Sequence, residues 1–384
     1  MRSMEIDRRR FLALTALAGL SPAVLRAATG LPEDVASRTD PLTAAEGPLY
    51  VAARKAHGRY EAVVLDVQGR DQLVVPMPAR GHSFALDPAR GRAVVFGRQP
   101  GFFAVAFRID GSRSPVALKA VSERHFFGHG VYLPDGKRMV ATENAYEAGK
   151  GVLGIYDASE GGDYRRIGEF ETGGIGPHEV VLLPDGKTLC VANGGILTHP
   201  DYGKLELNLD TMRPSLAYID ANDGRLIERV ELTQDLHRLS IRHLALAADG
   251  TVWFGCQHMG PASERPALVG RHRRGHEPEL FAGPEDVLRD CRNYIGSVAA
   301  DPAGGVIATS SPVGNQVLYW DAASGRMLGT TRLSDGCGVA PLAPGRFLVN
   351  SGMGALVQAG PAASAQSILT PSSGLSWDNH FRRL

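Results

Sequence analysis

The sequence predicts an all-β fold, a single seven-bladed β-propeller, and three observations support this prediction. A polar or small residue followed by a short apolar run and a tight turn recurs along the chain, as in "GHGVYLPDG" from Gly128 and "PHEVVLLPDG" from Pro177. The recurring residue falls at positions 82, 129, 178, 243, 296, 337 and 380, at intervals of 47, 49, 65, 53, 41 and 43 residues. Units of about 40–50 residues are typical of propeller blades. Gly (46) and Pro (24) are frequent, as in chains of many short strands joined by turns.

The N-terminal segment predicts export. Residues 1–28 are expected to be a twin-arginine signal peptide, because Arg8 and Arg9 precede an apolar run that begins near Phe11. This run is shorter than the roughly 20 residues of a membrane-spanning helix, so we expect no integral membrane segment in the mature chain. Residues 29–44 would form a linker, and residues 45–384 would form the propeller. These features predict a periplasmic protein.

The remaining elements follow from the runs between the motifs. Each unit has further strand-like runs, such as "TLCVANG" and "SLAYIDAN". The interval of 65 residues contains an insertion at about 196–215, which we expect to cap part of one face. The runs "PLYVAARK", "YEAVVLDVQ" and "QLVVPMP" supply three strands, and the C-terminal "WDNHFRRL" supplies one innermost strand. We expect these four strands to form one blade, which closes the ring without an open edge. A six-bladed ring and a pair of β-sandwiches are the alternative architectures.

The recurring position at the start of each motif is the candidate metal site. The strand that it begins lines the central channel of a propeller, so these side chains should converge at the top of the channel. Imidazole and thiolate groups are ligands for zinc, copper and iron. The predicted metal ligands are His82, His129, His178, His243, His380 and Cys337, and Gly296 takes the seventh position. The alternative is structural, with each histidine joining neighbouring strands by a hydrogen bond.

A second set of polar residues is expected around the same channel mouth. The predicted ligand-binding residues are Arg98, Glu143, Asn144, Glu179, Asn193, Gln257 and His258. Carboxylates such as Glu143 and Glu179 are suited to acid–base chemistry, as in hydrolytic propellers. The sequence therefore leaves open whether the protein is an enzyme, either a lactonase-like hydrolase or an oxidoreductase subunit. A non-catalytic scaffold that binds a protein partner is the third alternative.

The sequence lacks the features that are typical of several functional classes. Lys and Arg (41) balance Asp and Glu (41), so no nucleic-acid partner is expected. The sequence lacks Cys-x-x-Cys-His and a Gly-x-Gly-x-x-Gly unit, so we expect no haem c, no NAD and no flavin. It also lacks the Gly-x-Ser-x-Gly elbow of serine hydrolases. Cys190 and Cys256 fall in apolar strand-like runs, which predicts buried structural thiols.

The motifs "GHSFALDP", "FFGHGVYLPDG", "TENAYEAGKGVLGIYD", "GGIGPHEVVLLPDG", "LSIRHLALAADG" and "WDNH" resemble a bacterial family known as domain of unknown function 1513. The resemblance extends over essentially the whole mature chain. It implies a seven-bladed propeller of the superfamily that holds YVTN repeats and quinoprotein amine dehydrogenase subunits. It also implies an association with imelysin-like, iron-handling proteins as partners. The resulting expectation is a periplasmic propeller that binds an iron, copper or zinc ion, or a small ligand, at the histidine-rich top of its channel.

Overall fold

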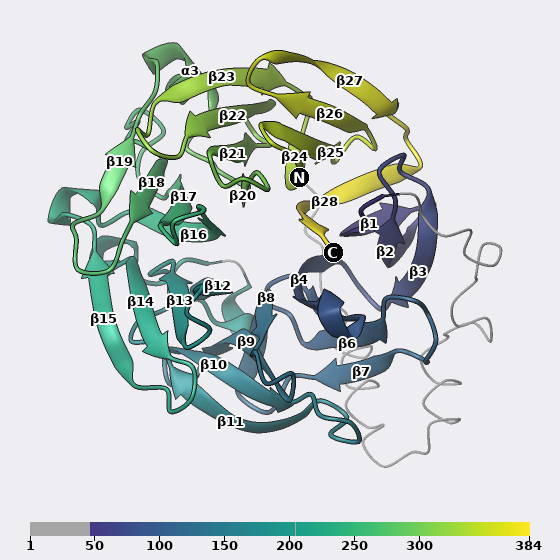
Figure 1. Cartoon of the computed structure of the whole chain (residues 1–384). Coiled ribbons are helices and arrows are strands. Elements are labelled where there is room, and N and C mark those ends of the chain that lie inside the picture. The colour runs from purple at the N-terminus through teal and green to yellow at the C-terminus, as the bar shows by residue number, and fades with distance from the viewer. Residues whose placement is uncertain (1–46, 204) are drawn as a thin grey trace.

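The computed structural model describes residues 47–203 and 205–384. These residues form seven four-stranded antiparallel sheets arranged as blades around a central channel, so the predicted seven-bladed propeller is confirmed (Figure 1). The alternatives of six blades or two sandwiches are excluded. Residues 1–46 lie outside the described residues, and the signal peptide and linker therefore stay predictions.

Each blade runs from an innermost strand at the channel to an outermost strand at the rim. In this order, the blade that joins both ends of the chain consists of β28 (Leu375–Arg383), β1 (Tyr50–Ala56), β2 (Arg59–Leu65) and β3 (Asp71–Met77). The next blade along the chain consists of β4 (Gly81–Asp87), β5 (Arg92–Gly97), β6 (Phe103–Arg108) and β7 (Val116–Lys119). The two blades after it consist of β8 (Arg124–Tyr132), β9 (Arg138–Ala145), β10 (Lys150–Asp157) and β11 (Arg165–Glu171), and of β12 (Pro177–Leu182), β13 (Thr188–Asn193), β14 (Ser215–Asp220) and β15 (Leu226–Glu231). The other three are β16 (Leu239–Leu246), β17 (Val252–His258), β18 (Val269–His272) and β19 (Glu279–Phe281); β20 (Ser297–Ala300), β21 (Val306–Ser311), β22 (Gln316–Asp321) and β23 (Met327–Arg332); β24 (Gly336–Ala343), β25 (Arg346–Ser351), β26 (Leu356–Gly360) and β27 (Ala363–Leu369).

The blade formed by both ends of the chain closes the ring. C-terminal β28 pairs antiparallel with β1, with Tyr50 opposite Arg383 and Ala56 opposite Leu375. Figure 1 shows the yellow β28 lying between the channel and the purple β1. The predicted closure is therefore confirmed, and it leaves no unpaired sheet edge between the first and last blades.

Burial changes from the inner to the outer strands and explains why their sequences differ. Strand β9 is buried at every position after Arg138, because neighbouring blades cover both of its faces. The outermost strand of the same blade, β11, alternates between exposed and partly buried residues. Apolar side chains fill the space between blades, as Val180, Leu189 and Val191 do beside Leu153. This packing holds the inner strands rigidly around the channel.

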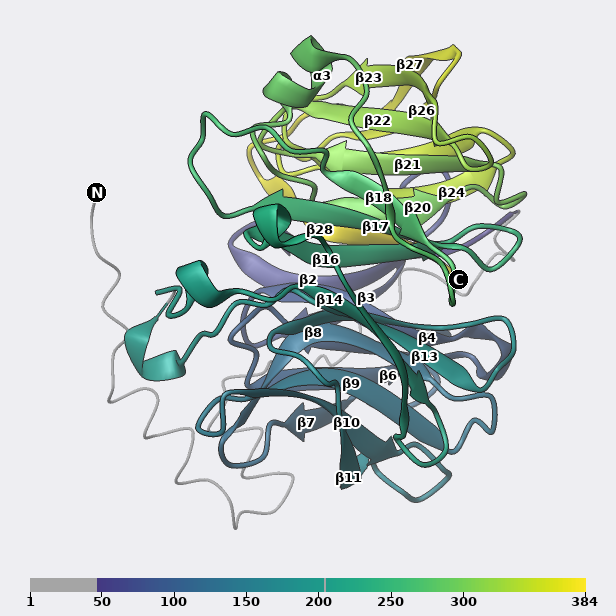
Figure 2. The ribbon, with the colours of Figure 1, turned by 90° about the vertical axis from the view of Figure 1, so that its left-hand side faces the viewer.

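Short helices and one insertion lie in the connections between the strands. The helices are η1 (Pro88–Arg90), η2 (Pro200–Tyr202), η3 (Leu209–Thr211), η4 (Gln234–Leu236) and α3 (Glu285–Asp290). The insertion joins β13 to β14 and carries η2 and η3, and Figure 2 shows this teal segment projecting from one face of the ring. None of the helices in the described part of the chain is long and apolar enough to cross a membrane. All four cysteines are free and buried, and the predicted burial of Cys190 and Cys256 is confirmed.

Candidate metal centre and adjoining cavity

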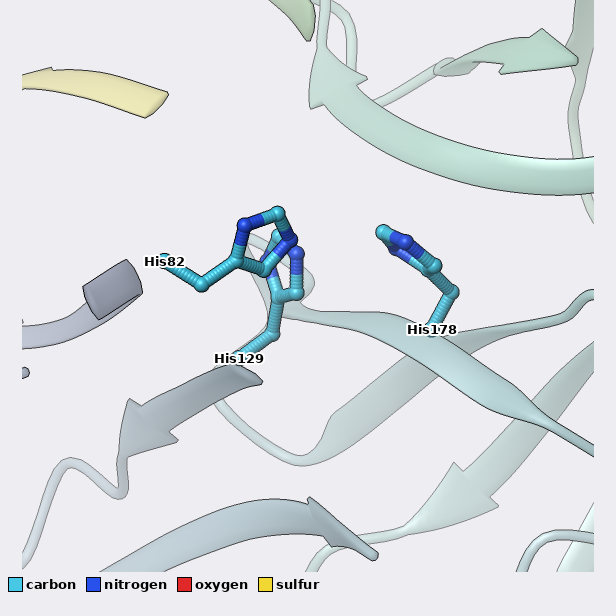
Figure 3. Close-up of side chains that lie close together, drawn as sticks. All are labelled: His82, His129 and His178. Atoms are coloured by element: carbon cyan, nitrogen blue, oxygen red, sulfur yellow. The ribbon is translucent and has the colours of Figure 1, made fainter. Parts of the chain in front are cut away.

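Five histidines from five blades meet at the channel axis. They come from the innermost strands β4, β8, β12, β16 and β28, and they are His82, His129, His178, His243 and His380. Their ring centroids lie 4.5 Å apart for His82 and His380, and 6.1 Å apart for His129 and His243. Figure 3 shows three of them, His82, His129 and His178, pointing toward one another. The predicted convergence is thus present in the structure.

A β-bulge directs most of these side chains toward the axis. Strand register shifts at the recurring position in β4, β8, β12, β16, β24 and β28. In β12, for example, Pro177 faces Asn193 while Glu179 faces Ala192, so His178 is the extra residue. A bulge bends the strand and re-aims a side chain. Strand β20, which follows Gly296, pairs regularly with β21 and contributes no histidine.

The histidine nitrogens are close enough for metal coordination after small movements. Two groups have ligand atoms within 4.8 Å of one another, and they are His82, His129 and His178, and His129, His243 and His380. Imidazole nitrogens bind zinc at about 2.0–2.1 Å, which separates two ligands by roughly 3–4 Å. His129 belongs to both groups, so its side chain is central to any ion bound here.

Two buried carboxylates lie behind the imidazoles. Glu179 Oε1 is 3.5 Å from His129 Nδ1, and Glu179 Oε2 is 3.5 Å from His243 Nδ1. Asp378 Oδ1 is 3.4 Å from His82 Nδ1. An ionised carboxylate only accepts, so its nearness favours a proton on Nδ1 and leaves the lone pair on Nε2. Metal-binding histidines in proteins are commonly oriented by carboxylates in this way.

The two carboxylates stay ionised, and the imidazoles of His82 and His243 stay neutral. Burial alone would raise the pKa of Glu179, but Arg382 and the neighbouring imidazoles hold it well below its ordinary value. Arg382 Nη2 also donates a hydrogen bond to Glu179 Oε1. Burial lowers the pKa of His82 to about 3 and that of His243 to about 4, against the opposite effect of their carboxylates.

The two histidines without a carboxylate are also neutral. Burial, with repulsion from the other imidazoles, holds the pKa of His178 and His380 well below the usual value. Neutral imidazole is the form that binds metal ions. His82, His178, His243 and His380 can therefore act as ligands at neutral pH.

Most of the buried nitrogens have no hydrogen-bond partner in the described part of the protein. The atoms are His129 Nε2, His178 Nδ1, both ring nitrogens of His243 and both of His380. The contact of His243 Nδ1 with Glu179 is electrostatic, because its length and alignment fall short of a hydrogen bond. Buried polar atoms are nearly always satisfied in proteins, so a group of orphaned nitrogens indicates a bound ion or water.

Of the five histidines, His82 joins neighbouring inner strands as the structural interpretation expects, through its contact with Asp378 on β28. Between β8 and β12, a threonine on the second strand of one blade makes the link. Thr142 Oγ1 lies 3.2 Å from the carbonyl oxygen of His129 and 3.3 Å from that of His178, so it links β8 with β12. The imidazoles themselves are left facing the axis.

A cavity of about 280 Å³ lies against the histidine centre. His82, His178 and His243 form part of its wall, and the insertion contributes Ile196 and Glu206. Arg98 and Gln257, both predicted to bind a ligand, also line it. Arg98 Nη1 is 3.3 Å from Asp378 Oδ1, and Gln257 Nε2 donates to Ile295 O at 3.1 Å.

A family model matches residues 75–384 and describes the family as protein of unknown function (DUF1513). The chain belongs to the DUF1513 family. A search of curated proteins gives no match. Among solved structures, hydrazine synthase from Kuenenia stuttgartiensis is similar, with a TM-score of 0.58 and 16% identity over 77% of this chain and 87% of that chain. A chain of a nidogen/laminin complex has a TM-score of 0.48 and 14% identity over 73% of this chain and 92% of that chain. The first likeness shows the fold alone.

Other predicted residues of this DUF1513 member lie away from the histidine centre. Glu143 is buried inside its blade, where Tyr156 Oη donates to it at 2.6 Å and Arg166 Nη2 at 2.9 Å. Burial raises the pKa of Glu143 despite Arg166. Neither Glu143 nor Glu179 lines the cavity. The acid–base role that the sequence allowed for these carboxylates therefore has no contact with the cavity.

Asn144, Asn193 and His258 anchor loops. Asn144 Nδ2 donates to Thr198 O of the insertion at 3.1 Å, and Asn193 Nδ2 donates to Thr172 O at 3.1 Å. His258 Nε2 lies 2.8 Å from Glu264 Oε2. None of the three is among the residues that line the cavity.

Cys337 occupies its predicted position on β24 but lies outside both histidine groups. Its thiol is 3.2 Å from Asn350 Oδ1 and 3.4 Å from Asp378 O. Burial raises its pKa far above the ordinary value, so the thiol stays protonated at neutral pH. Its role as a metal ligand stays a prediction.

Sequence reasoning missed five residues of this DUF1513 site: Asp378, Asn379, Arg382, Arg242 and Tyr294. Asp378 and Arg382 were visible as neighbours of His380 in "WDNHFRRL", and Arg242 directly precedes His243. In a regular strand, adjacent residues point to opposite faces, so these neighbours would not be expected at one site. The bulges change that phase, and Arg242 is itself the extra residue of β16.

Proposed function

We propose that this DUF1513 protein binds a transition-metal ion at the five-histidine centre and serves an accessory role in periplasmic iron or copper handling. The observation that carries the proposal is the set of six orphaned imidazole nitrogens in one buried cluster. The energetic cost of burying such atoms without partners is about 1–3 kcal/mol each. A bound ion would offset part of this cost, because it can accept one nitrogen from each of the four rings concerned, His129, His178, His243 and His380.

The ligand set limits the kind of ion. A set of imidazole ligands suits zinc, copper, iron and nickel, whereas magnesium and calcium prefer oxygen ligands. At equal free concentrations, copper(II) binds nitrogen ligands more tightly than the other divalent ions of this series. The metal present in the cell depends on supply as well as affinity, so iron, copper and zinc are the proposed candidates.

His129 is the proposed central ligand, because it is shared by both groups. Glu179 orients His129 and His243, and Asp378 orients His82. These carboxylates also place negative charge close to a bound cation. The ion would be screened from bulk water, since all five histidines are less than a tenth exposed.

The cellular role rests on separate observations. Arg8 and Arg9 in the N-terminal segment support export by the twin-arginine route and a periplasmic location. The resemblance to a family associated with imelysin-like proteins supports a partner in iron handling. A propeller that holds one buried ion with several imidazoles is suited to storing or delivering that ion.

The test is elemental analysis of the full-length protein exported by its native host. We expect close to one equivalent of iron, copper or zinc, and a restored equivalent after chelation and reconstitution. Less than about a tenth of an equivalent after reconstitution would contradict the metal site. Fractionation of the same cells tests the location, and recovery of the protein in the cytoplasm alone would contradict export.

A further inference from the structure

The cavity beside the histidine centre carries an excess of positive charge. Apart from histidines, the charged residues that line it in the described part of the chain are Arg98, Arg242 and Glu206. Two cations therefore face one carboxylate in this cavity. The centre itself would become still more positive when a metal ion binds.

Arg242 lacks a carboxylate partner. Its Nε donates to Ser240 Oγ at 3.1 Å, and its Nη2 lies 4.0 Å from Met259 Sδ. It forms no ion pair within residues 47–203 and 205–384. A buried or half-buried guanidinium normally has an anion within reach, since desolvated charge without a partner is costly. Most of its N–H groups are therefore free to bind an anion in the cavity.

The charged groups around the cavity leave an excess of positive charge near Arg242. Arg98 lines the same cavity and adds a second guanidinium, whereas Glu206 is the one carboxylate of the described lining. Arg98 itself shares Asp378 with Arg80 and His82. Asp378 is therefore already occupied, and it does not neutralise the second guanidinium.

The shape and lining of the cavity narrow the class of anion. Its volume of about 280 Å³ falls at the small end of ligand pockets. Phe127, Ile196 and Met259 give it apolar walls, whereas Tyr294 and Asn379 provide polar groups. A guanidinium binds a planar carboxylate through two parallel hydrogen bonds. An apolar wall would be of no use to an inorganic oxyanion.

The backbone beside Tyr294 supports a functional cavity. Arg292 and Asn293 both adopt left-handed conformations, with φ of 49° and 59°. Such conformations are unfavourable for residues other than glycine and cluster at binding sites. They immediately precede Tyr294, which lines the cavity and whose hydroxyl accepts a hydrogen bond from Asn379 Nδ2 at 3.4 Å.

We propose that this cavity binds a small organic carboxylate, with Arg242 and Arg98 holding the carboxylate group and Phe127, Ile196 and Met259 contacting the apolar part. The bound molecule would lie directly against His82, His178 and His243. Its contact with a metal ion rests on the proposed function, whereas its binding by the arginines does not.

The test is titration calorimetry of the full-length exported protein with acetate, benzoate and inorganic phosphate, before and after metal loading. We expect benzoate to bind more tightly than acetate or phosphate. Arg242→Gln should weaken benzoate binding at least tenfold, because it removes one charged, bidentate contact. Glu206→Gln should strengthen binding, because it removes the one negative charge in the described lining, which repels a bound anion. Arg225→Gln, at an exposed arginine outside the cavity, is the matched control and should have no effect.

The outcomes separate this proposal from the metal site. No measurable binding of any of the three anions, or benzoate binding unchanged by Arg242→Gln, would overturn it. Phosphate binding at least as tight as benzoate would overturn the organic class of ligand. Benzoate binding that responds to both Arg242→Gln and Glu206→Gln, in a protein that takes up no metal, would support the cavity site and refute the metal centre. Opposite effects of these two variants cannot arise from a general loss of folding.

Discussion

Replacing His129 by alanine should abolish tight metal binding while leaving the metal-free protein nearly as stable as before. His129 is the residue common to both ligand groups, so its loss leaves two ligands in each. Structural zinc sites with four ligands gain about 10–16 kcal/mol, so one ligand contributes roughly 3 kcal/mol. A loss of about 3 kcal/mol corresponds to about a hundredfold weaker binding.

The stability of the metal-free variant is set by two opposing effects. Removing a buried imidazole opens a cavity, which costs about 2–3 kcal/mol. It also removes His129 Nε2, a buried atom without a hydrogen-bond partner, which relieves about 1–3 kcal/mol. We therefore expect the free energy of unfolding of the metal-free protein to change by less than about 2 kcal/mol.

The assay combines elemental analysis with thermal unfolding of the metal-free protein. Val180→Ala is the matched control, because Val180 is 4% exposed and packs between blades just beyond His178. It should lower the free energy of unfolding by about 1–3 kcal/mol and leave the metal content per folded molecule unchanged. The reasoning is refuted if His129→Ala retains the wild-type metal content, or if it destabilises the metal-free protein more than Val180→Ala does.

Three further predictions follow from the same contacts. Gly128→Ala should lower both the metal affinity and the melting temperature. Gly128 has φ of +107°, and a Cβ there would come within 2.5 Å of His82 Cδ2. Unchanged metal affinity would count against His82 as a ligand. Cys337→Ser should leave the metal content unchanged in elemental analysis, since the thiol contacts Asn350 and lies outside both histidine groups, and a loss of metal would show that it is a ligand after all. His125 lies buried beside the insertion, and burial lowers its pKa to about 4. Protonation of His125 is therefore more favourable in the unfolded chain, and it lowers the free energy of unfolding by up to about 3 kcal/mol as the pH falls from about 6.5 to 4. In denaturant titrations, His125→Gln should therefore lose less stability than the wild type over this range, and parallel curves would disprove the assignment.

Much of the architecture was predictable from the sequence because it is repeated. The interval between motifs indicates the blade, and the four strand-like runs split between the two ends of the chain indicate how the ring closes. The same repetition placed His82, His129, His178, His243 and His380 at equivalent positions, which is sufficient to bring them to one axis. Equivalent positions in a closed ring converge whatever the residues between them.

The chemical character of the site was decided only by the tertiary structure. Side chains of a regular strand alternate between its faces, so a sequence pattern would direct His178 and Glu179 to opposite sides. The bulge in β12 changes this phase and allows both residues to face the histidine cluster. Glu179 then contacts Arg382, which lies 203 residues further along the chain. Such a contact depends on ring closure, so no local pattern reveals it. Burial by the surrounding blades, rather than the motif itself, keeps His178 and His380 neutral and leaves six of the ring nitrogens in the cluster without a hydrogen-bond partner.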